Sequence, residues 1–153
     1  MRKLILAFLI CCSTAAFAQK TNFSGTWKLD TTKTVFGQGP KTLIPWTIKV
    51  DQQADHLLLS RINVDEQMQE QAPITETLSF DGTPFQRNNG DNQVTTTLNW
   101  SDGSSFVLTR EGGQKATETW TLADNGQTLV IDRAVEQKSN GFKYEIKCYY
   151  TKQ

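Results

Sequence analysis

The sequence predicts an all-β protein, an antiparallel up-and-down meander of about ten strands that closes into a barrel or a strongly rolled half-barrel. Thr, Val, Ile and aromatic residues alternate with polar residues in short runs, which is the pattern of half-buried strands. Turn dipeptides separate these runs, and no segment after residue 18 has a helical period. Closure into a barrel would bury the shared apolar face and remove two unpaired edges.

The first 18 residues have the three-part pattern of a secretory signal peptide. Arg2 and Lys3 precede an apolar run over residues 4–10, and small residues close the segment at Ala18. The apolar run is shorter than the roughly 20 residues that a membrane-spanning helix needs. The pattern predicts export to the periplasm or the extracellular space.

The cysteines leave a lipid anchor open as an alternative and argue against intrachain disulfides. Cys11 or Cys12 would be the attachment site of a lipid anchor, which is less favoured because bulky Ile10 or Cys11 stands where such sites need a small residue. Cys148 is the single cysteine of residues 19–153, so we expect no intrachain disulfide framework.

Residues 19–153 have the length of a single domain. Without Arg2 and Lys3, fourteen basic residues face sixteen acidic ones, which gives a net charge of about −2. Such a balance provides no basic surface for nucleic acid. The segment has no second long apolar run. No metal and no cofactor are expected, because His56 is the only histidine and a metal or haem site needs more ligands. The oligomeric state stays open.

The turn signals place each strand in order. The strands are predicted near residues 22–29, 45–52, 55–64, 73–80, 83–88, 91–100, 104–110, 115–123, 127–138 and 141–151. From the fourth strand onward, the separating dipeptides are Asp81-Gly82, Asn89-Gly90, Asp102-Gly103, Gly112-Gly113, Asn125-Gly126 and Asn140-Gly141. Residues 31–44 contain two glycines and a proline and are expected to form an irregular loop. A two-sheet sandwich is the alternative, but the short turns after residue 73 disfavour its crossing connections.

The inward face is predicted from the parity of each strand. In the first, second and fourth strands it carries Phe23, Trp27, Leu29, Trp46, Ile48, Val50, Ile74, Leu78 and Phe80. The third strand is ambiguous because Leu57, Leu58 and Leu59 are consecutive, so the direction of Arg61 stays open.

Loop lengths predict the register of the later strands. A two-residue turn at Asn125-Gly126 would place Glu118 opposite Arg133, and the same turn at Asn140-Gly141 would place Arg133 opposite Cys148. The two preceding hairpins fit three-residue loops, in which Gly103 and Gly113 would adopt the left-handed conformation.

The first strand resembles a known superfamily. Its Gly25-Thr26-Trp27 is similar to the Gly-x-Trp signature of the lipocalin and fatty-acid-binding-protein (calycin) superfamily, and the run to Gly37 resembles uncharacterised secreted bacterial lipocalin-like proteins. The resemblance implies a barrel that holds a small apolar ligand and is plugged at one end by the tryptophan. The chain departs from fatty-acid-binding proteins because it lacks their helical pair. In place of their ligand-binding Arg-x-Tyr it has Lys147-x-Tyr149, which is predicted to face outward.

Arginines are the candidate ligand-binding residues. The inner face receives Arg87, Arg110 and Arg133, of which Arg87 and Arg110 end their strands and are expected at the rim, with their guanidinium groups reaching water. Arg133 either forms a structural ion pair with Glu118 or binds an anion in a bidentate fork. The predicted site residues are Arg133, Glu118, Arg110, Tyr144, Tyr150, Trp120 and Phe106.

Three classes of function fit this sequence. The first is a secreted barrel that binds or carries a small, partly apolar, anionic ligand such as a fatty acid. The second is a barrel with a filled core that acts through its surface as an envelope or secreted interaction module. The third is an enzyme in which Glu118 and an arginine form an acid/base pair, although no motif of hydrolytic or nucleotide chemistry supports it.

Overall fold

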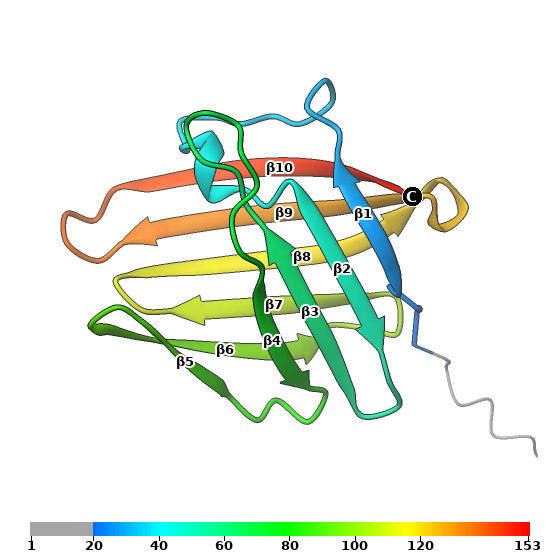
Figure 1. Cartoon of the computed structure of the whole chain (residues 1–153). Helices are drawn as coiled ribbons and strands as arrows, with labels where there is room; N and C mark the ends of the chain where they lie inside the picture. Colours follow the sequence, from blue (N-terminus) through cyan, green and yellow to red (C-terminus); the bar gives the residue numbers. More distant parts are fainter. Residues whose placement is uncertain (1–19) are drawn as a thin grey trace, which may run out of the picture.

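The computed structural model describes residues 20–153, which have the predicted all-β fold. Ten antiparallel strands form one sheet that rolls into a nearly closed barrel (Figure 1). The predicted signal peptide, residues 1–18, lies outside the described residues. Within residues 20–153, no helix has the length and apolar character needed to cross a membrane.

The strands follow the predicted order closely. They are β1 (Gly25–Leu29), β2 (Thr47–Gln52), β3 (His56–Ile62), β4 (Ile74–Ser79), β5 (Phe85–Asn89), β6 (Asn92–Trp100), β7 (Ser105–Glu111), β8 (Gln114–Ala123), β9 (Thr128–Gln137) and β10 (Lys143–Lys152). The segment between β1 and β2 is a loop with one 3₁₀ turn, η1 (Lys41–Leu43), as its irregular composition predicts, and a second turn, η2 (Asp124–Gly126), joins β8 to β9.

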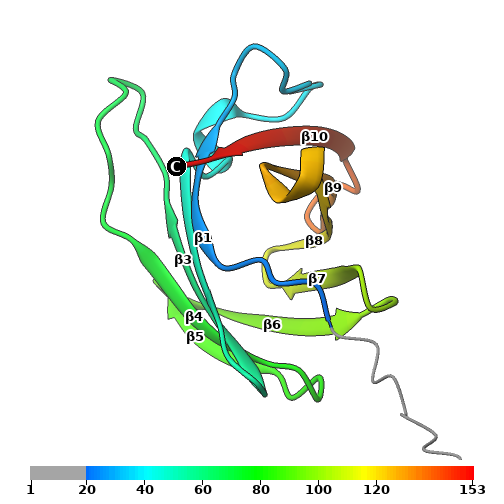
Figure 2. The ribbon, with the colours of Figure 1, turned by 90° about the vertical axis from the view of Figure 1, so that its right-hand side faces the viewer.

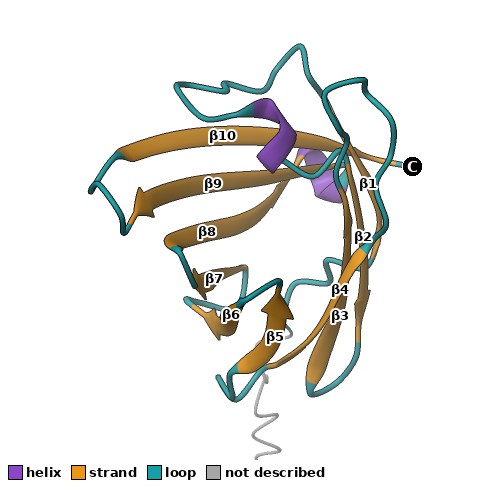
Figure 3. Ribbon diagram, turned by 60° about the vertical axis from the view of Figure 1, so that its left-hand side comes forward, coloured by secondary structure: helices purple, strands orange, loops and turns teal. Residues whose placement is uncertain are grey.

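The sheet is an antiparallel meander whose ladder is interrupted between β4 and β5. Its spatial order is β4-β3-β2-β1-β10-β9-β8-β7-β6-β5, so β1 and β10 pair with each other. The edge strands β4 and β5 lie near each other without a ladder of hydrogen bonds between them (Figure 3). A single continuous sheet excludes the sandwich alternative.

The register prediction is correct at one late hairpin and wrong at the other. Glu118 lies opposite Arg133, as the turn at Asn125-Gly126 predicts. In contrast, Arg133 lies opposite Ile146 rather than Cys148. The final loop spans residues 138–141 because the Gln137 amide donates to the Phe142 carbonyl (2.9 Å) and so closes a longer turn. This two-residue shift preserves the side-chain parity, so the buried face of β10 is still the predicted one.

The predicted left-handed glycines are also wrong. Neither Gly103 nor Gly113 has a positive φ. In the first of these loops the Asp102 carboxylate accepts the amide N–H groups of Ser104 and Ser105 at 2.7 and 2.8 Å. This side-chain turn shapes the loop and removes the need for a left-handed residue.

Aromatic side chains fill one end of the barrel. Phe106 stacks on Trp120 at 5.2 Å between ring centroids, and Phe23 meets Phe106 edge-on at 4.7 Å. The chain before β1 crosses this end (Figure 2), where the Gln52 side chain holds the backbone of Thr21 and Phe23. This aromatic end is packed, so any room for a ligand must lie at the other end.

Replacing Gly37 by alanine is expected to lower the free energy of unfolding by about 2–3 kcal/mol, because backbone strain and a clash add together. Gly37 has a φ of +56°, and an added Cβ would lie 2.5 Å from the Glu145 carbonyl oxygen. Gly90 is the matched control, since its φ is +60° and an added Cβ would meet nothing within 4 Å. Urea unfolding of Gly37→Ala and Gly90→Ala measures the destabilisation that the clash adds to the backbone strain. Equal losses of unfolding free energy in the two variants would show that the clash adds nothing.

Candidate functional site

A cavity of about 450 Å³ lies at the end of the barrel opposite the aromatic end. Its volume falls within the range of small-molecule sites, roughly 300–1,000 Å³. The wall is partly apolar, through Leu43, Pro45, Ile74, Val94 and Ala116. The rest of the wall besides the arginines is mostly polar and includes one carboxylate: Asn63, Asn92, Glu111, Gly112, Gly113, Gln114, Gln137 and Ser139.

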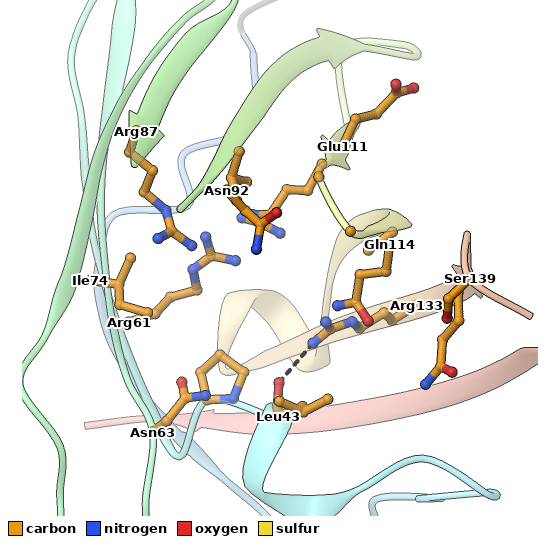
Figure 4. Close-up of a pocket in the computed structure, with 17 residues that line it drawn as sticks. Leu43, Arg61, Asn63, Ile74, Arg87, Asn92, Glu111, Gln114, Arg133 and Ser139 are labelled. Carbon is orange, nitrogen blue, oxygen red and sulfur yellow. Dashed lines mark hydrogen bonds between the residues drawn. The ribbon is translucent and has the colours of Figure 1, made fainter. Parts of the chain in front are cut away.

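A charged cluster lies at the base and sides of this cavity. It comprises the four arginines and two glutamates that face inward from β3, β4, β5, β7, β8 and β9: Arg61, Glu76, Arg87, Arg110, Glu118 and Arg133. All four arginines line the cavity (Figure 4 labels Arg61, Arg87 and Arg133). The alternating pattern of the strands brings these residues inside, but their meeting requires strands far apart in sequence.

Glu118 is shared among three arginines. Its Oε1 atom lies 2.8 Å from Arg110 Nη1, 3.7 Å from Arg133 Nε and 3.9 Å from Arg61 Nη1. Its Oε2 atom accepts the indole N–H of Trp120 at 3.1 Å. The predicted pair with Arg133 is therefore present, but Arg110 is the nearer cation.

Glu76 is the second shared carboxylate. Its Oε2 atom accepts hydrogen bonds from Nη2 of both Arg61 and Arg110, the latter at 3.3 Å. Its Oε1 atom accepts the Thr96 hydroxyl at 2.8 Å and lies 3.7 Å from Arg87 Nε. Every carboxylate oxygen of the cluster is thus engaged by at least one donor.

The guanidinium groups, by contrast, have donors to spare. Each arginine carries five N–H groups, yet within residues 20–153 the four make three hydrogen bonds, two to Glu76 and one from Arg133 Nη1 to the Leu43 carbonyl at 2.9 Å. The 2.8 Å contact of Arg110 Nη1 with Glu118 Oε1 adds a fourth close approach. The Nε atoms of Arg87, Arg110 and Arg133 are buried without a hydrogen-bond partner. Within the cluster, four positive charges face two negative ones, while Glu111 of the cavity wall is paired with Lys115 and Lys138. The surplus positive charge of the cluster favours an anion in the cavity.

The cluster keeps both glutamates ionised. Burial alone would raise the pKa of Glu118, but Arg110, Arg133 and Arg61 outweigh it and lower the pKa to about 2. Burial opposes ionisation of Glu76 as well, and Arg61 and Arg110 again reverse the balance and lower its pKa. The pKa of Arg61 falls to about 10, chiefly through burial and secondly through Arg110, so it stays charged at neutral pH. Neither glutamate holds a proton that it could donate, which disfavours the acid/base pair of the enzyme hypothesis.

Acid is expected to destabilise the fold through these two carboxylates. Because their pKa values are lower in the folded chain than the ordinary value near 4.3, the stabilisation is complete above that value. It is lost as the pH falls from about 5 towards 2, and Glu118 alone accounts for about 3 kcal/mol. Unfolding free energies measured between pH 2 and 7 should show this decline. A flat profile over that range would contradict the assignment.

The structure corrects the prediction that Arg110 lies at the rim. Arg110 is buried, with 8% of its surface exposed, because the end of β7 lies over Glu76 of β4. Arg87 is closer to the prediction, since 23% of its side chain is exposed, yet it too approaches Glu76. Arg61, whose direction the sequence left open, is buried and inward because Leu57 and Leu59 share its face.

The other predicted site residues do not line the cavity. Phe106 and Trp120 belong to the aromatic end, and the Tyr150 hydroxyl donates to the Pro45 carbonyl at 2.9 Å. Tyr144 is buried beneath Gly39 of the β1–β2 loop. Among the predicted residues, Arg110 and Arg133 line the cavity and Glu118 holds them from below.

The predicted list of site residues does not include Glu76, Arg61 and Arg87. The sequence places Glu76 and Arg87 on the inward face, but the convergence of all three on one cavity depends on the fold of the whole barrel. Among residues 20–153, no group of three or more His, Cys, Asp and Glu side chains is placed to hold a metal ion. The described side chains instead suit the binding of an anion with an apolar part.

Comparison with known proteins adds no relative. No protein-family model matches the chain, and no curated protein matches it. The fold and the site thus define a barrel with a cationic cavity.

Proposed function

We propose that this chain is an exported barrel protein that binds or carries a small, partly apolar, anionic ligand in its open-end cavity. One observation carries the proposal: each carboxylate oxygen of the charged cluster already has a donor, while buried guanidinium N–H groups beside a 450 Å³ cavity have no hydrogen-bond partner among the described residues. Burying unpaired donors is costly. An anion would satisfy them and balance the surplus charge.

The apolar wall and the signal pattern support the other parts of the proposal. Pro45, Ile74 and Val94 offer a surface for a hydrocarbon group beside the arginines. The void below the cluster is only about 10 Å³, so the ligand stays in the open half of the barrel. Export rests on residues 1–18 and on the lipocalin-like resemblance of the first strand.

A surface interaction module is the second candidate. The packed aromatic end favours it, since half of the barrel has no lumen. The two candidates differ in whether the cavity binds anything.

Octanoate and its uncharged amide test the anionic ligand. Calorimetric titration is expected to show octanoate binding and at least about tenfold weaker binding of the amide, since a charged hydrogen bond contributes about 1.5–3 kcal/mol. Arg133→Ala should weaken octanoate binding, whereas Lys49→Gln, which removes an exposed outward charge, should not. Native mass spectrometry of the protein from its own host gives a second readout. No copurified ligand and no binding of octanoate would favour the interaction module.

A further inference from the structure

The charged cluster forms a row with an arginine at each end, Arg87 at one and Arg133 at the other, and its surplus positive charge lies at these two ends. The contacts form a row in which Arg133 touches Glu118, Arg61 and Arg110 lie between the two carboxylates, and Glu76 touches Arg87 at the far end. The middle arginines each contact both glutamates. Each terminal arginine contacts a single glutamate, in both cases through Nε at 3.7 Å.

The terminal arginines are also the least satisfied as donors to carboxylate. Neither Arg87 nor Arg133 makes a hydrogen bond to a carboxylate within the described part of the chain, and the Nε atom of each is buried without a partner. Their side chains remain 23% and 11% exposed, which leaves both reachable from the cavity. Arg87 lies beside Asn92 on one side of the cavity, and Arg133 lies beside Gln114 on the other (Figure 4).

The same cavity offers an apolar surface and limited room. Ile74, Val94 and Ala116 line it. If each non-hydrogen atom takes about the 30 Å³ of a liquid water, the cavity holds roughly fifteen such atoms. A straight diacid of about six to ten carbons has roughly that many atoms or fewer.

We infer that the ligand of this cavity is a dicarboxylate, with one carboxylate held by Arg87, the other by Arg133, and an apolar spacer lying between them. The inference rests on the proposed function and specifies its ligand class. A monocarboxylate would neutralise only one end of the row. A compact dianion such as a phosphate monoester would place both charges at the same end and leave the other guanidinium unpaired.

The test compares three ligands of equal chain length by calorimetric titration: suberate with two carboxylates, octanoate with one, and octyl phosphate with both charges at one end. Wild-type protein is expected to bind suberate about 10- to 100-fold more tightly than octanoate, as an additional charged hydrogen-bond pair implies. It should also bind suberate more tightly than octyl phosphate. These comparisons need no variant, so they hold even where a substitution unfolds the barrel.

Two variants then locate the two carboxylates. Arg87→Gln and Arg133→Gln should each reduce the preference for suberate over octanoate to about twofold or less, the statistical factor for two equivalent ends. Lys49→Gln should retain the full preference. Melting curves by circular dichroism check that each variant is folded before titration.

The possible outcomes distinguish a failure of the dicarboxylate inference from a failure of the proposed anion binding. Equal affinity for octanoate and suberate in the wild type would overturn the dicarboxylate and leave an anion-binding barrel. Tighter binding of octyl phosphate would overturn the two-ended arrangement. Binding of none of the three ligands would overturn the proposed function as well.

Discussion

Glu118→Gln is expected to lower the free energy of unfolding by about 3–5 kcal/mol, the usual cost of removing one partner from a buried ionic group. The Glu118 side chain is 4% exposed, and its Oε1 atom lies within 4 Å of Arg61, Arg110 and Arg133. Glutamine preserves the size and still accepts the indole N–H of Trp120, so the loss isolates the charge. Urea unfolding at pH 7 measures it.

Two comparisons make the Glu118 result specific. Glu145→Gln removes a carboxylate from an exposed, outward position of β10 in the same sheet and should cost less than about 0.5 kcal/mol. Adding Arg133→Gln to Glu118→Gln should recover part of the loss, because the pair shares one interaction. If Glu118→Gln costs no more than Glu145→Gln, the cluster does not depend on this carboxylate.

Trp27→Ala is expected to destabilise the chain by about 3–5 kcal/mol, as truncations of buried tryptophan do. Trp27 has no exposed surface, and its indole N–H donates to the Phe23 carbonyl at 3.0 Å. Phe23 in turn packs edge-on against Phe106 at the aromatic end. The alanine variant therefore leaves a void and loosens the segment that crosses this end of the barrel.

A milder substitution and a surface control accompany the Trp27 variant. Trp27→Phe keeps most of the buried area but loses the hydrogen bond, and its expected cost is about 1–2 kcal/mol. Phe142→Ala removes an aromatic ring that is 41% exposed and should cost the least of the three. Thermal unfolding ranks them, and a Trp27→Ala loss as small as that of Phe142→Ala would mean that Trp27 is not part of the core.

Sequence periodicity predicts this fold well because a strand needs only local information. Alternation of apolar and polar residues decides which side chains face inward, even where the predicted register is wrong. At Asn140-Gly141 the observed register places Arg133 opposite Ile146 instead of Cys148, and the same side chains of β10 still face inward. The loop geometry was harder to predict. At Asp102 a side chain provides the turn that glycine was expected to provide.

The candidate site was only half predictable for a physical reason. Adjacent strands can be aligned through their turns, which gives Glu118 opposite Arg133. Contacts across the lumen have no such signal. Glu76 meets Arg110 only because β4 and β7 come to face each other when the sheet rolls, and that contact buries an arginine that parity and position alone place at the rim.

The break in the sheet has a consequence for how the barrel assembles. Across the sheet, the strands run from β5 to β10 and then from β1 to β4. The spatial order is therefore the chain order with its starting point moved from β1 to β5. Among residues 20–153, every ladder between named strands except one joins strands that follow each other in the chain, and the exception pairs β1 with β10, with Trp27 opposite Lys152. Two nearly independent meanders can therefore form first, and their joining is the step that carries the entropic cost of closing a long loop. A circular permutant that begins in the β4–β5 turn, with the native termini joined, would make β10 and β1 consecutive in the chain. It is expected to fold faster while keeping the same contacts between strands.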